Sequence, residues 1–392
     1  MAEDTTPKEK KATEQTSGKA TEESTSMLVR YWGVRGSIPS PLNTKYVRQK
    51  EEALIRRIME DGGTQKLFQN VDFFGEVTNQ EQVNERIREY LASLPLSLSG
   101  TYGGDTTCLE VQVKDSPLIV IDAGTGARLL GGMLSRLIFE NKNINPLNSD
   151  EATKRHIHLL FSHYHWDHIQ GFPFFGPGFI PGDKNVKVHF YGKRDARKRL
   201  SEVLVGQQQY PNFPVEWIDM PCDKEYTELP RLDPKPILLG KATITYQELT
   251  HPDSVFAYAI ETDGKKFVCA SDTEHKDSPD LRLIRLARNA NILYYDAQYI
   301  PEEYVGIPGT LTGPVPKFDW GHSTYEWGIR NALAANAATL VLGHHEPMRD
   351  DFLIEKLYER ALDFKDAQLK LPENDGKRLE VVMAHQGLEQ RL

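Results

Sequence analysis

The feature that most constrains this chain is a cluster of histidines that directly follows a stretch of apolar residues. Residues 161–171 read F-S-H-Y-H-W-D-H-I-Q-G, so three of the 12 histidines in the chain lie within six positions. The preceding H-I-H-L-L predicts a buried strand, which places the cluster on the loop at the end of that strand. Alternate residues of an extended segment point the same way, so His163 and His165 are placed to hold one ion together. Asp167 and His168 follow the turn and are placed to address a second ion.

Imidazole and carboxylate groups in this spacing favour a metal site. Both groups suit zinc, and they also suit manganese or iron. The alternative is a surface cluster, or histidines that are each satisfied by separate partners. That alternative is common for a lone histidine, but it is disfavoured for this spacing directly after an apolar strand.

Three further titratable residues stand just past other predicted apolar strands. His251 follows T-I-T-Y-Q-E-L-T, Asp272 follows K-F-V-C-A-S, and His344 follows T-L-V-L-G. Because loops at strand ends converge on functional sites, these residues are expected to complete a site for two metal ions. The adjacent His345 competes with His344 for this role, and His344 is preferred because it is the first residue past the strand.

Composition narrows the class of protein. A hydrophobic share of 39% and a charged share of 26% describe an ordinary soluble globular protein. The formal net charge of −9 disfavours broad nucleic-acid binding, which depends on basic surface. The cysteines, Cys108, Cys222 and Cys269, are too widely spaced for a disulfide framework and favour a reducing compartment. No apolar run reaches the roughly 18 residues that span a bilayer, and no signal-peptide core is present, so a cytoplasmic location is expected.

The order of the predicted elements indicates an α/β architecture. Residues 1–26 are rich in Lys, Glu, Thr and Ser and predict a disordered tail, with one domain over residues 27–392. Residues 43–100 show a helical period and predict an insertion, which either caps the site or serves packing alone. Strands are predicted at 27–34, 108–113, 118–124, 156–162, 186–191, 242–249, 256–262, 266–271, 292–295 and 339–342. Helices are predicted at 128–137, 195–204, 280–287, 324–337 and 351–366, interleaved with the strands.

The spacing of these residues resembles the metallo-β-lactamase-fold superfamily, whose pattern is H-x-H-x-D-H followed by a distant His, an Asp and a His. The resemblance implies a four-layer αββα sandwich from residue 27 onward, with 43–100 as an insertion. It implies two divalent metal ions, with zinc expected and manganese or iron as alternatives. The implied ligands are His163, His165 and His251 for one ion, Asp167, His168 and His344 for the other, and Asp272 as the bridge. Asp122, in I-V-I-D-A-G-T-G, is implied to shape the site without binding metal itself.

Within that superfamily the details are similar to the phosphodiesterase branch that includes ribonuclease Z. S-D-T at 271–273 resembles the G-D-T of that branch, and G-H-S-T at 321–324 resembles its H-S-T, which implies that His322 is catalytic. The segments R-Y-W-G-V-R-G-S-I-P-S-P, Y-G-G-D-T-T-C, H-W-D-H-I-Q-G-F-P-F-F and H-H-E-P are similar to a bacterial cyclic-nucleotide phosphodiesterase-like group. Asp105 departs from that group, which commonly has Asn at this position.

The expected function is hydrolysis of a phosphodiester bond, in a small cyclic nucleotide, by a hydroxide that bridges the two ions. Asp167 would orient the hydroxide, and His322 would protonate the leaving oxygen. The alternative for His322 is a structural position beside a helix cap formed by Ser323 or Thr324.

Three other functions stay open at this stage. An RNA endonuclease of the ribonuclease Z kind is disfavoured by the acidic balance and by the missing tRNA-binding arm. The others are a lactone or thioester hydrolase on the same scaffold, and a ligand-binding sensor without turnover. The partner expected is a small nucleotide rather than RNA or a membrane, and a homodimer built through the helical insertion is an option.

Overall fold

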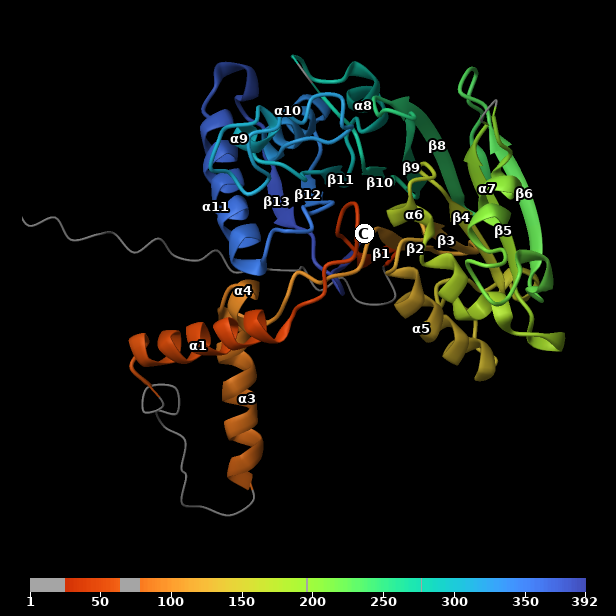
Figure 1. Cartoon of the computed structure of the whole chain (residues 1–392), viewed down its shortest axis with the longest axis horizontal. Helices are drawn as coiled ribbons and strands as arrows, with labels where there is room; N and C mark the ends of the chain where they lie inside the picture. Colours follow the sequence, from red (N-terminus) through yellow and green to blue (C-terminus); the bar gives the residue numbers. More distant parts are fainter. Residues whose placement is uncertain (1–24, 64–77, 195–196, 276) are drawn as a thin grey trace, which may run out of the picture.

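Two seven-stranded sheets packed face to face form the body of the molecule, with helices on both outer faces (Figure 1). The computed structural model describes residues 25–63, 78–194, 197–275 and 277–392. This arrangement is the αββα sandwich that the sequence predicts. The sequence predicts a disordered tail at 1–26, and residues 1–24 of it lie outside the described residues.

The first sheet has the order β14-β1-β2-β3-β4-β5-β6. Its strands from β3 to β6 are parallel, whereas β14, β1, β2 and β3 pair antiparallel. The members are β1 (Met27–Gly33), β2 (Cys108–Val113), β3 (Leu118–Ile121), β4 (His156–Leu160), β5 (Lys187–Lys193), β6 (Asp223–Leu229) and β14 (Glu389–Arg391).

The second sheet has the order β13-β12-β11-β10-β9-β8-β7, and its strands from β10 to β13 are parallel. The members are β7 (Ile237–Leu239), β8 (Ala242–Leu249), β9 (Val255–Thr262), β10 (Lys265–Ala270), β11 (Ile292–Asp296), β12 (Thr339–Gly343) and β13 (Glu380–Met383). Parallel strands end at the same edge of a sheet, so the loops that leave β10, β11 and β12 are neighbours.

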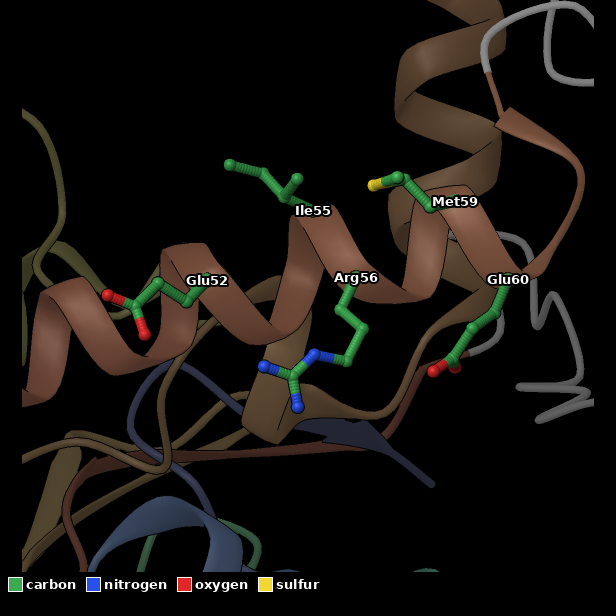
Figure 2. Close-up of a pocket in the computed structure, with 5 residues that line it drawn as sticks. All are labelled: Glu52, Ile55, Arg56, Met59 and Glu60. Carbon is green, nitrogen blue, oxygen red and sulfur yellow. The ribbon is translucent and has the colours of Figure 1, made fainter.

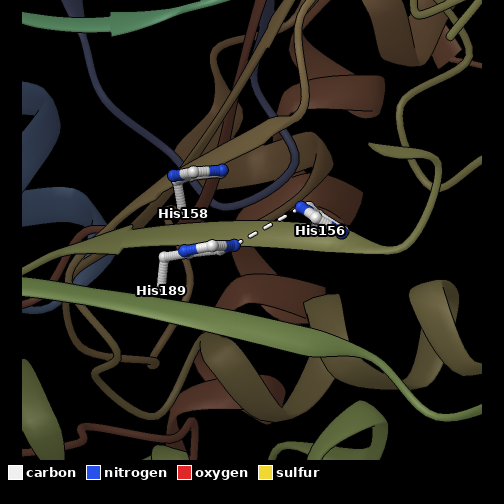
Figure 3. Close-up of side chains that lie close together, drawn as sticks. All are labelled: His156, His158 and His189. Atoms are coloured by element: carbon white, nitrogen blue, oxygen red, sulfur yellow. Dashed lines mark hydrogen bonds between the residues drawn. The ribbon is translucent and has the colours of Figure 1, made fainter. Parts of the chain in front are cut away.

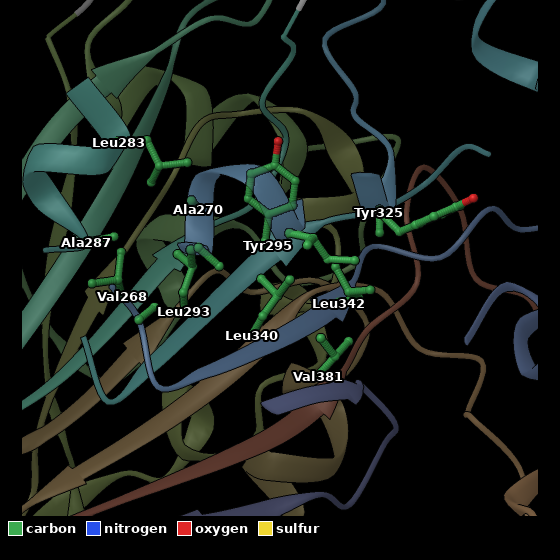
Figure 4. Packing of buried hydrophobic residues seen from close by; sticks show 14 of the residues in the cluster. Val268, Ala270, Leu283, Ala287, Leu293, Tyr295, Tyr325, Leu340, Leu342 and Val381 are labelled. Carbon is green, nitrogen blue, oxygen red and sulfur yellow. The ribbon is translucent and has the colours of Figure 1, made fainter. Parts of the chain in front are cut away.

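Successive residues of the central strands pack into different layers of the core. In β10, Phe267 belongs to the cluster between the two sheets, whereas Val268 belongs to the cluster under the outer helices. Figure 4 shows that outer cluster, where Val268, Leu293 and Leu340 lie near Leu283. Because side chains of a strand alternate between its faces, apolar residues at every position indicate a sheet covered on both sides.

Helices occupy the outer layers and the segment before β2. They are α1 (Thr44–Glu60), α3 (Thr78–Ser93), α4 (Leu96–Ser99), α5 (Ala127–Phe139), α6 (Trp166–Ile169), α7 (Leu200–Gln207), α8 (Leu281–Leu286), α9 (Pro301–Tyr304), α10 (Tyr325–Ala335) and α11 (Asp351–Gln368). The helix predicted at 195–204 is wrong at its start, because Arg199 has extended backbone and its N–H is bonded to Glu202. Across the described ranges, none of the helices has both the length and the apolar character needed to cross a membrane.

Helices α1 and α3 extend away from the sandwich, at the lower left of Figure 1. The Lys50 ammonium of α1 pairs with Asp351 at the start of α11, which connects the two helices. Figure 2 shows that Ile55 and Met59 lie on the same helix as Glu52, Arg56 and Glu60, with which they line a surface pocket. The descriptions of 43–100 as an insertion and of this region as a dimer interface stay predictions.

Candidate metal centre

The first group of candidate ligands consists of His163, His165 and His251, which offer ring nitrogens within 4.8 Å of one another. His163 and His165 lie on the loop between β4 and α6, and His251 lies between β8 and β9. Within this group, His165 Nδ1 and His251 Nε2 lie 3.1 Å apart. The structure therefore brings together the three histidines expected to share one ion.

The second group consists of Asp167, His168, Asp272 and His344, all buried, with ligand atoms within 4.8 Å of one another. His168 Nε2 lies 3.2 Å from Asp167 Oδ2 and 3.2 Å from Asp272 Oδ2. His344 Nε2 lies 3.1 Å from Asp272 Oδ1 and 3.3 Å from Asp167 Oδ2. These four residues come from loops of both sheets, and they include the three residues expected at the second ion together with Asp272, the expected bridge.

Asp272 connects the two groups. Its Oδ2 atom lies 3.7 Å from His163 Nε2, while Oδ1 faces His344 in the second group. Oδ2 also lies 3.2 Å from His168 Nε2, so this carboxylate faces nitrogens of both groups, which is what a bridging ligand requires. Its assignment as the bridge, like the other ligand roles, belongs to the proposal below.

The outward hydrogen bonds of the histidines leave their inner nitrogens available. His168 Nδ1 lies 2.7 Å from Asp122 Oδ2, His251 Nδ1 lies 3.0 Å from the Gly321 carbonyl, and His344 Nδ1 lies 3.1 Å from Gln298 Oε1. These oxygens can only accept, so each Nδ1 carries a proton, and Nε2 is the nitrogen that is left to bind a metal in place of its own proton. Among the described residues, the buried Nε2 atoms of His163 and His168 have no hydrogen-bond partner. This donor set fits divalent metal ions.

The charges of the cluster also favour a bound divalent cation. Burial opposes ionisation, but the charge of His168 outweighs it and holds the pKa of Asp272 well below its ordinary value. Burial alone would lower the pKa of His344, whereas Asp272 above all raises it to about 9. The carboxylates therefore stay ionised and favour positive charge between them, which a divalent cation supplies.

Asp122, at the end of β3, supports the cluster from behind. Its two oxygens accept hydrogen bonds from the Ser162 N–H and hydroxyl, each 2.7 Å long, as well as from His168. Asp122, Asp272 and His344 have φ angles of 60°, 54° and 57°, in the left-handed region. Non-glycine residues adopt this conformation rarely, and it recurs at functional sites where the surroundings enforce it.

His322 lies beside both groups without belonging to either. Its ring stacks on that of His344 with centroids 5.0 Å apart, and lies 5.7 Å from the ring of His251. His322 Nδ1 lies 2.9 Å from Oδ2 of Asp296, which is fully buried at the end of β11. Sequence reasoning did not identify Asp296, although an aspartate directly after N-I-L-Y-Y shows the same strand-end pattern as the other candidates. Asp296, His322 and His344 also form a group with metal-binding geometry.

Segments that the sequence comparison singled out meet at this centre. The Arg35 guanidinium donates to the carbonyl oxygens of Gly103 and Arg349, both at 2.7 Å, and so connects three distant loops. The next residues reach the cluster, where the Ser37 N–H donates to Asp167 Oδ2 at 2.8 Å. His345 is directed elsewhere and its Nε2 contacts the Ala384 carbonyl at 2.7 Å. Of the two adjacent histidines, His344 is the one that faces the carboxylates.

Two glycines bring the main chain against the rings of the candidate ligands. A Cβ atom on Gly36 would lie 2.5 Å from His344 Nδ1, and one on Gly321 would lie 2.0 Å from His251 Nδ1. Gly321 also has a φ of 88°, which L-residues with side chains rarely adopt. Each glycine thus allows a loop to pass directly over one histidine.

Comparison with known proteins agrees with this architecture. Residues 118–345 match the family model of the beta-lactamase superfamily domain. The chain belongs to this superfamily. Members of the metallo-β-lactamase superfamily are metal-dependent hydrolases, and the His and Asp groups of this member are able to bind metal.

Solved structures that are similar to this chain share little sequence identity with it. The metallo-beta-lactamase fold protein YhfI from Bacillus subtilis is 16% identical, with a TM-score of 0.52 over 93% of this chain and 99% of that chain. The short form of human tRNase Z is 13% identical, with a TM-score of 0.49 over 92% of this chain and 98% of that chain. Yeast PDE1 is 13% identical, with a TM-score of 0.49 over 73% of this chain and 95% of that chain. A search of curated proteins found no match.

Proposed function

We propose that this superfamily member is a phosphodiesterase that uses two divalent metal ions, with zinc preferred, to hydrolyse a small cyclic nucleotide. The observation that carries the proposal is the pairing of two ligand groups through Asp272, with His322 beside them. In the proposal, His163, His165 and His251 hold one ion, Asp167, His168 and His344 hold the other, and Asp272 holds both.

Two divalent ions at this place would offset the negative charge of a phosphoryl group and favour ionisation of a water molecule. The protein supplies the orientation. Asp167 is fixed by the Ser37 N–H, so its carboxylate keeps one direction toward the centre and is positioned to orient the attacking water. Ser37 in turn belongs to the loop that Arg35 anchors, which keeps the groups around the reacting atoms in place.

His322 is the proposed general acid. Asp296 accepts from His322 Nδ1 and stabilises the doubly protonated imidazolium ring, whose Nε2 would give its proton to the leaving oxygen of the substrate. Asp296 is itself held by the backbone N–H groups of Gln298 and Ser323, at 3.0 and 3.3 Å. A side chain positioned in this way typically contributes about 10²–10⁴-fold to the rate of a proton transfer.

The choice of a cyclic nucleotide is supported by the motifs that surround the centre. The segments around Arg35, Gly103 and His344 are those whose sequence is similar to the cyclic-nucleotide phosphodiesterase-like group, and they are in mutual contact. Loops in contact with the centre are well placed to select the substrate.

A hydrolysis screen tests the proposal. Purified protein loaded in turn with zinc, manganese and iron is assayed with 2′,3′- and 3′,5′-cyclic nucleotides, a tRNA precursor and an acyl lactone. We expect hydrolysis of a cyclic mononucleotide that stops when the metal is chelated. Cleavage of the tRNA precursor or the lactone alone would replace the proposal with one of the other two hydrolases. Nucleotide binding without turnover, with fewer than about one ion per chain after metal supplementation, would indicate a sensor.

A further inference from the structure

A second cluster of histidines lies at the opposite end of β4 from the candidate metal centre. His156 and His158 are at the start of β4, and His189 is in the neighbouring strand β5, as Figure 3 shows. His158 is paired with His189 in the strand register, and His189 is paired with Glu225 of β6. A row of potential ligands therefore crosses three adjacent strands on one face of the sheet.

The ring nitrogens of this cluster lie close enough together for one metal ion. One nitrogen from each of the three rings lies within 4.8 Å of the others, and His156 Nδ1 lies 3.4 Å from His189 Nε2. Two ligands about 2.0–2.1 Å from a tetrahedral zinc ion are separated by a little over 3 Å. The contact between His165 and His251 in the candidate metal centre is of the same kind, at 3.1 Å.

Polar neighbours orient two of the rings. His189 Nδ1 lies 2.8 Å from Glu225 Oε2, so Nδ1 donates to the carboxylate and Nε2 keeps its lone pair. His158 Nδ1 lies 2.9 Å from the Tyr191 hydroxyl, and in the tautomer in which Nδ1 donates to this oxygen, Nε2 keeps a lone pair for a metal. The rings of His158 and His189 stack with centroids 4.2 Å apart and an interplanar angle of 2°, so one ring must turn on metal binding for both to direct a lone pair at the same ion.

The rings are neutral at physiological pH, as metal ligation requires. Burial, followed by the charge of the neighbouring His189, lowers the pKa of His158 to about 3. Burial, followed by the charge of Lys187, lowers the pKa of His156, and burial also lowers the pKa of His189. Lys187 is itself paired with Glu225, so its charge is partly neutralised. The Glu225 side chain is 55% exposed, which gives an ion access from solvent.

We propose that His156, His158 and His189 bind a further transition-metal ion, of the zinc class, at a site separate from the candidate metal centre. Glu225 orients His189 in this site, and the ion would connect the interior strands β4 and β5 of the first sheet, near the start of β4. Three imidazoles suit zinc, copper or nickel better than magnesium or calcium, which prefer oxygen ligands.

Zinc content measures this site without any assay of activity. Wild-type protein and the variant His189→Phe are equilibrated with buffered zinc, and the zinc per chain is determined by mass spectrometry. Phenylalanine keeps a ring against His158 but offers no nitrogen. We expect the variant to hold one equivalent less than wild type, and His156→Gln to do the same. His385→Asn is the control, because His385 lies outside both clusters and its Nδ1 contacts the Gln386 carbonyl; its zinc content should equal that of wild type.

A second variant tests the orienting carboxylate. Glu225→Gln should lower the affinity of this site for zinc by about 10–100-fold, because replacing a residue that orients a metal-bound histidine has an effect of that size. Equal zinc content in wild type, His189→Phe and His156→Gln would overturn the proposal. These proteins are compared by their zinc content alone. The test of this site therefore does not depend on whether the protein hydrolyses cyclic nucleotides.

Discussion

His322 is in contact with a ring of each ligand group, and its role determines how the proposed reaction ends. Replacement by Gln removes the acidic proton but keeps a polar side chain of similar reach. We expect kcat to fall by about 10²–10⁴-fold while the metal content stays at the wild-type value. Steady-state kinetics combined with metal analysis of the same preparation measures both quantities.

The metal content separates two roles for this residue. A loss of bound metal in His322→Gln would contradict the proposal and make His322 a ligand, in the group that it forms with Asp296 and His344. Asp296→Asn is the companion variant, because it keeps the shape of the site but weakens the hold on His322 Nδ1. We expect its kcat to lie between those of wild type and His322→Gln.

His275 is a buried residue whose protonation opposes folding. Only 4% of it is exposed, and neither ring nitrogen has a hydrogen-bond partner among the described residues. Burial lowers its pKa to about 4. The unfolded chain therefore takes up this proton near pH 6.5 and the folded chain only near pH 4, so stability is complete above pH 6.5 and is lost as the pH falls through that window.

Replacement of His275 by Phe should remove that loss. Between pH 7 and pH 5 the wild-type residue is expected to cost about 2 kcal/mol of the free energy of unfolding, and His275→Phe should lack this component. Urea unfolding at both pH values, with a chelator present throughout, measures the difference between the two proteins. An equal decline with pH in both proteins would show that the His275 ring is solvated or paired.

At the scale of residues, a position at the end of a predicted strand identified the candidate ligands. The sequence did not show which residues from different strands lie next to one another. The seven proposed ligands were predicted because each follows an apolar run, and the structure places them in two adjacent groups. Asp296 follows the same kind of run and was missed, because the predicted strand ended at Tyr295. His156 and His158 were interpreted as strand residues only, since their partner His189 is remote in sequence and strand register is not visible in a single chain.

The loop after β1 depends on one buried arginine. Arg35 is 2% exposed, and besides its two short hydrogen bonds to carbonyl oxygens it lies 3.8 Å from Asp351. Replacement by Leu leaves these acceptors buried and the charge of Asp351 less compensated. We expect Arg35→Leu to lower the free energy of unfolding by about 3–5 kcal/mol, as measured by chemical denaturation.

An exposed arginine provides the matched control for this variant. The Arg136 side chain is 80% exposed and lies 3.9 Å from Glu140, so Arg136→Leu should change stability by less than about 1 kcal/mol. If both variants lost the same small amount, Arg35 would have no anchoring role and the loop would be held by its backbone contacts alone.

Among the elements, the interior strands were predictable and the edge strands were not. The four strands that sequence analysis missed, β6, β7, β13 and β14, are the four edges of the two sheets. β6 has the sequence D-K-E-Y-T-E-L and β14 has E-Q-R, so neither shows an apolar pattern. An edge strand is held by backbone pairing on one side and buries few side chains, which leaves little trace in composition.

At the scale of the whole molecule, the proposed ligands belong to both halves of the sandwich. His163 to His168 follow β4 of the first sheet, whereas Asp272 and His344 follow β10 and β12 of the second. Metal held by these proposed ligands would therefore stabilise the packing of the two sheets as well as the loops. Chelation should lower the free energy of unfolding by about 4 kcal/mol where free metal is at 1,000 times its Kd.

Thermal unfolding with and without a chelator, on wild type and Asp272→Asn, measures this effect. The midpoint of wild type should fall on chelation, and that of Asp272→Asn should respond less because its metal affinity is already reduced. An unchanged wild-type midpoint would mean that the sheets hold together without help from the metal.

The close approach of Gly36 to His344 and of Gly321 to His251 has a consequence for engineering. Exchanging loops between relatives is a natural way to redirect such an enzyme to new substrates. Any transplanted loop must keep a glycine at these two places, because even a methyl group there would displace a ring that the metal needs. Two residues without side chains, Gly36 and Gly321, therefore limit which loops this fold can accept.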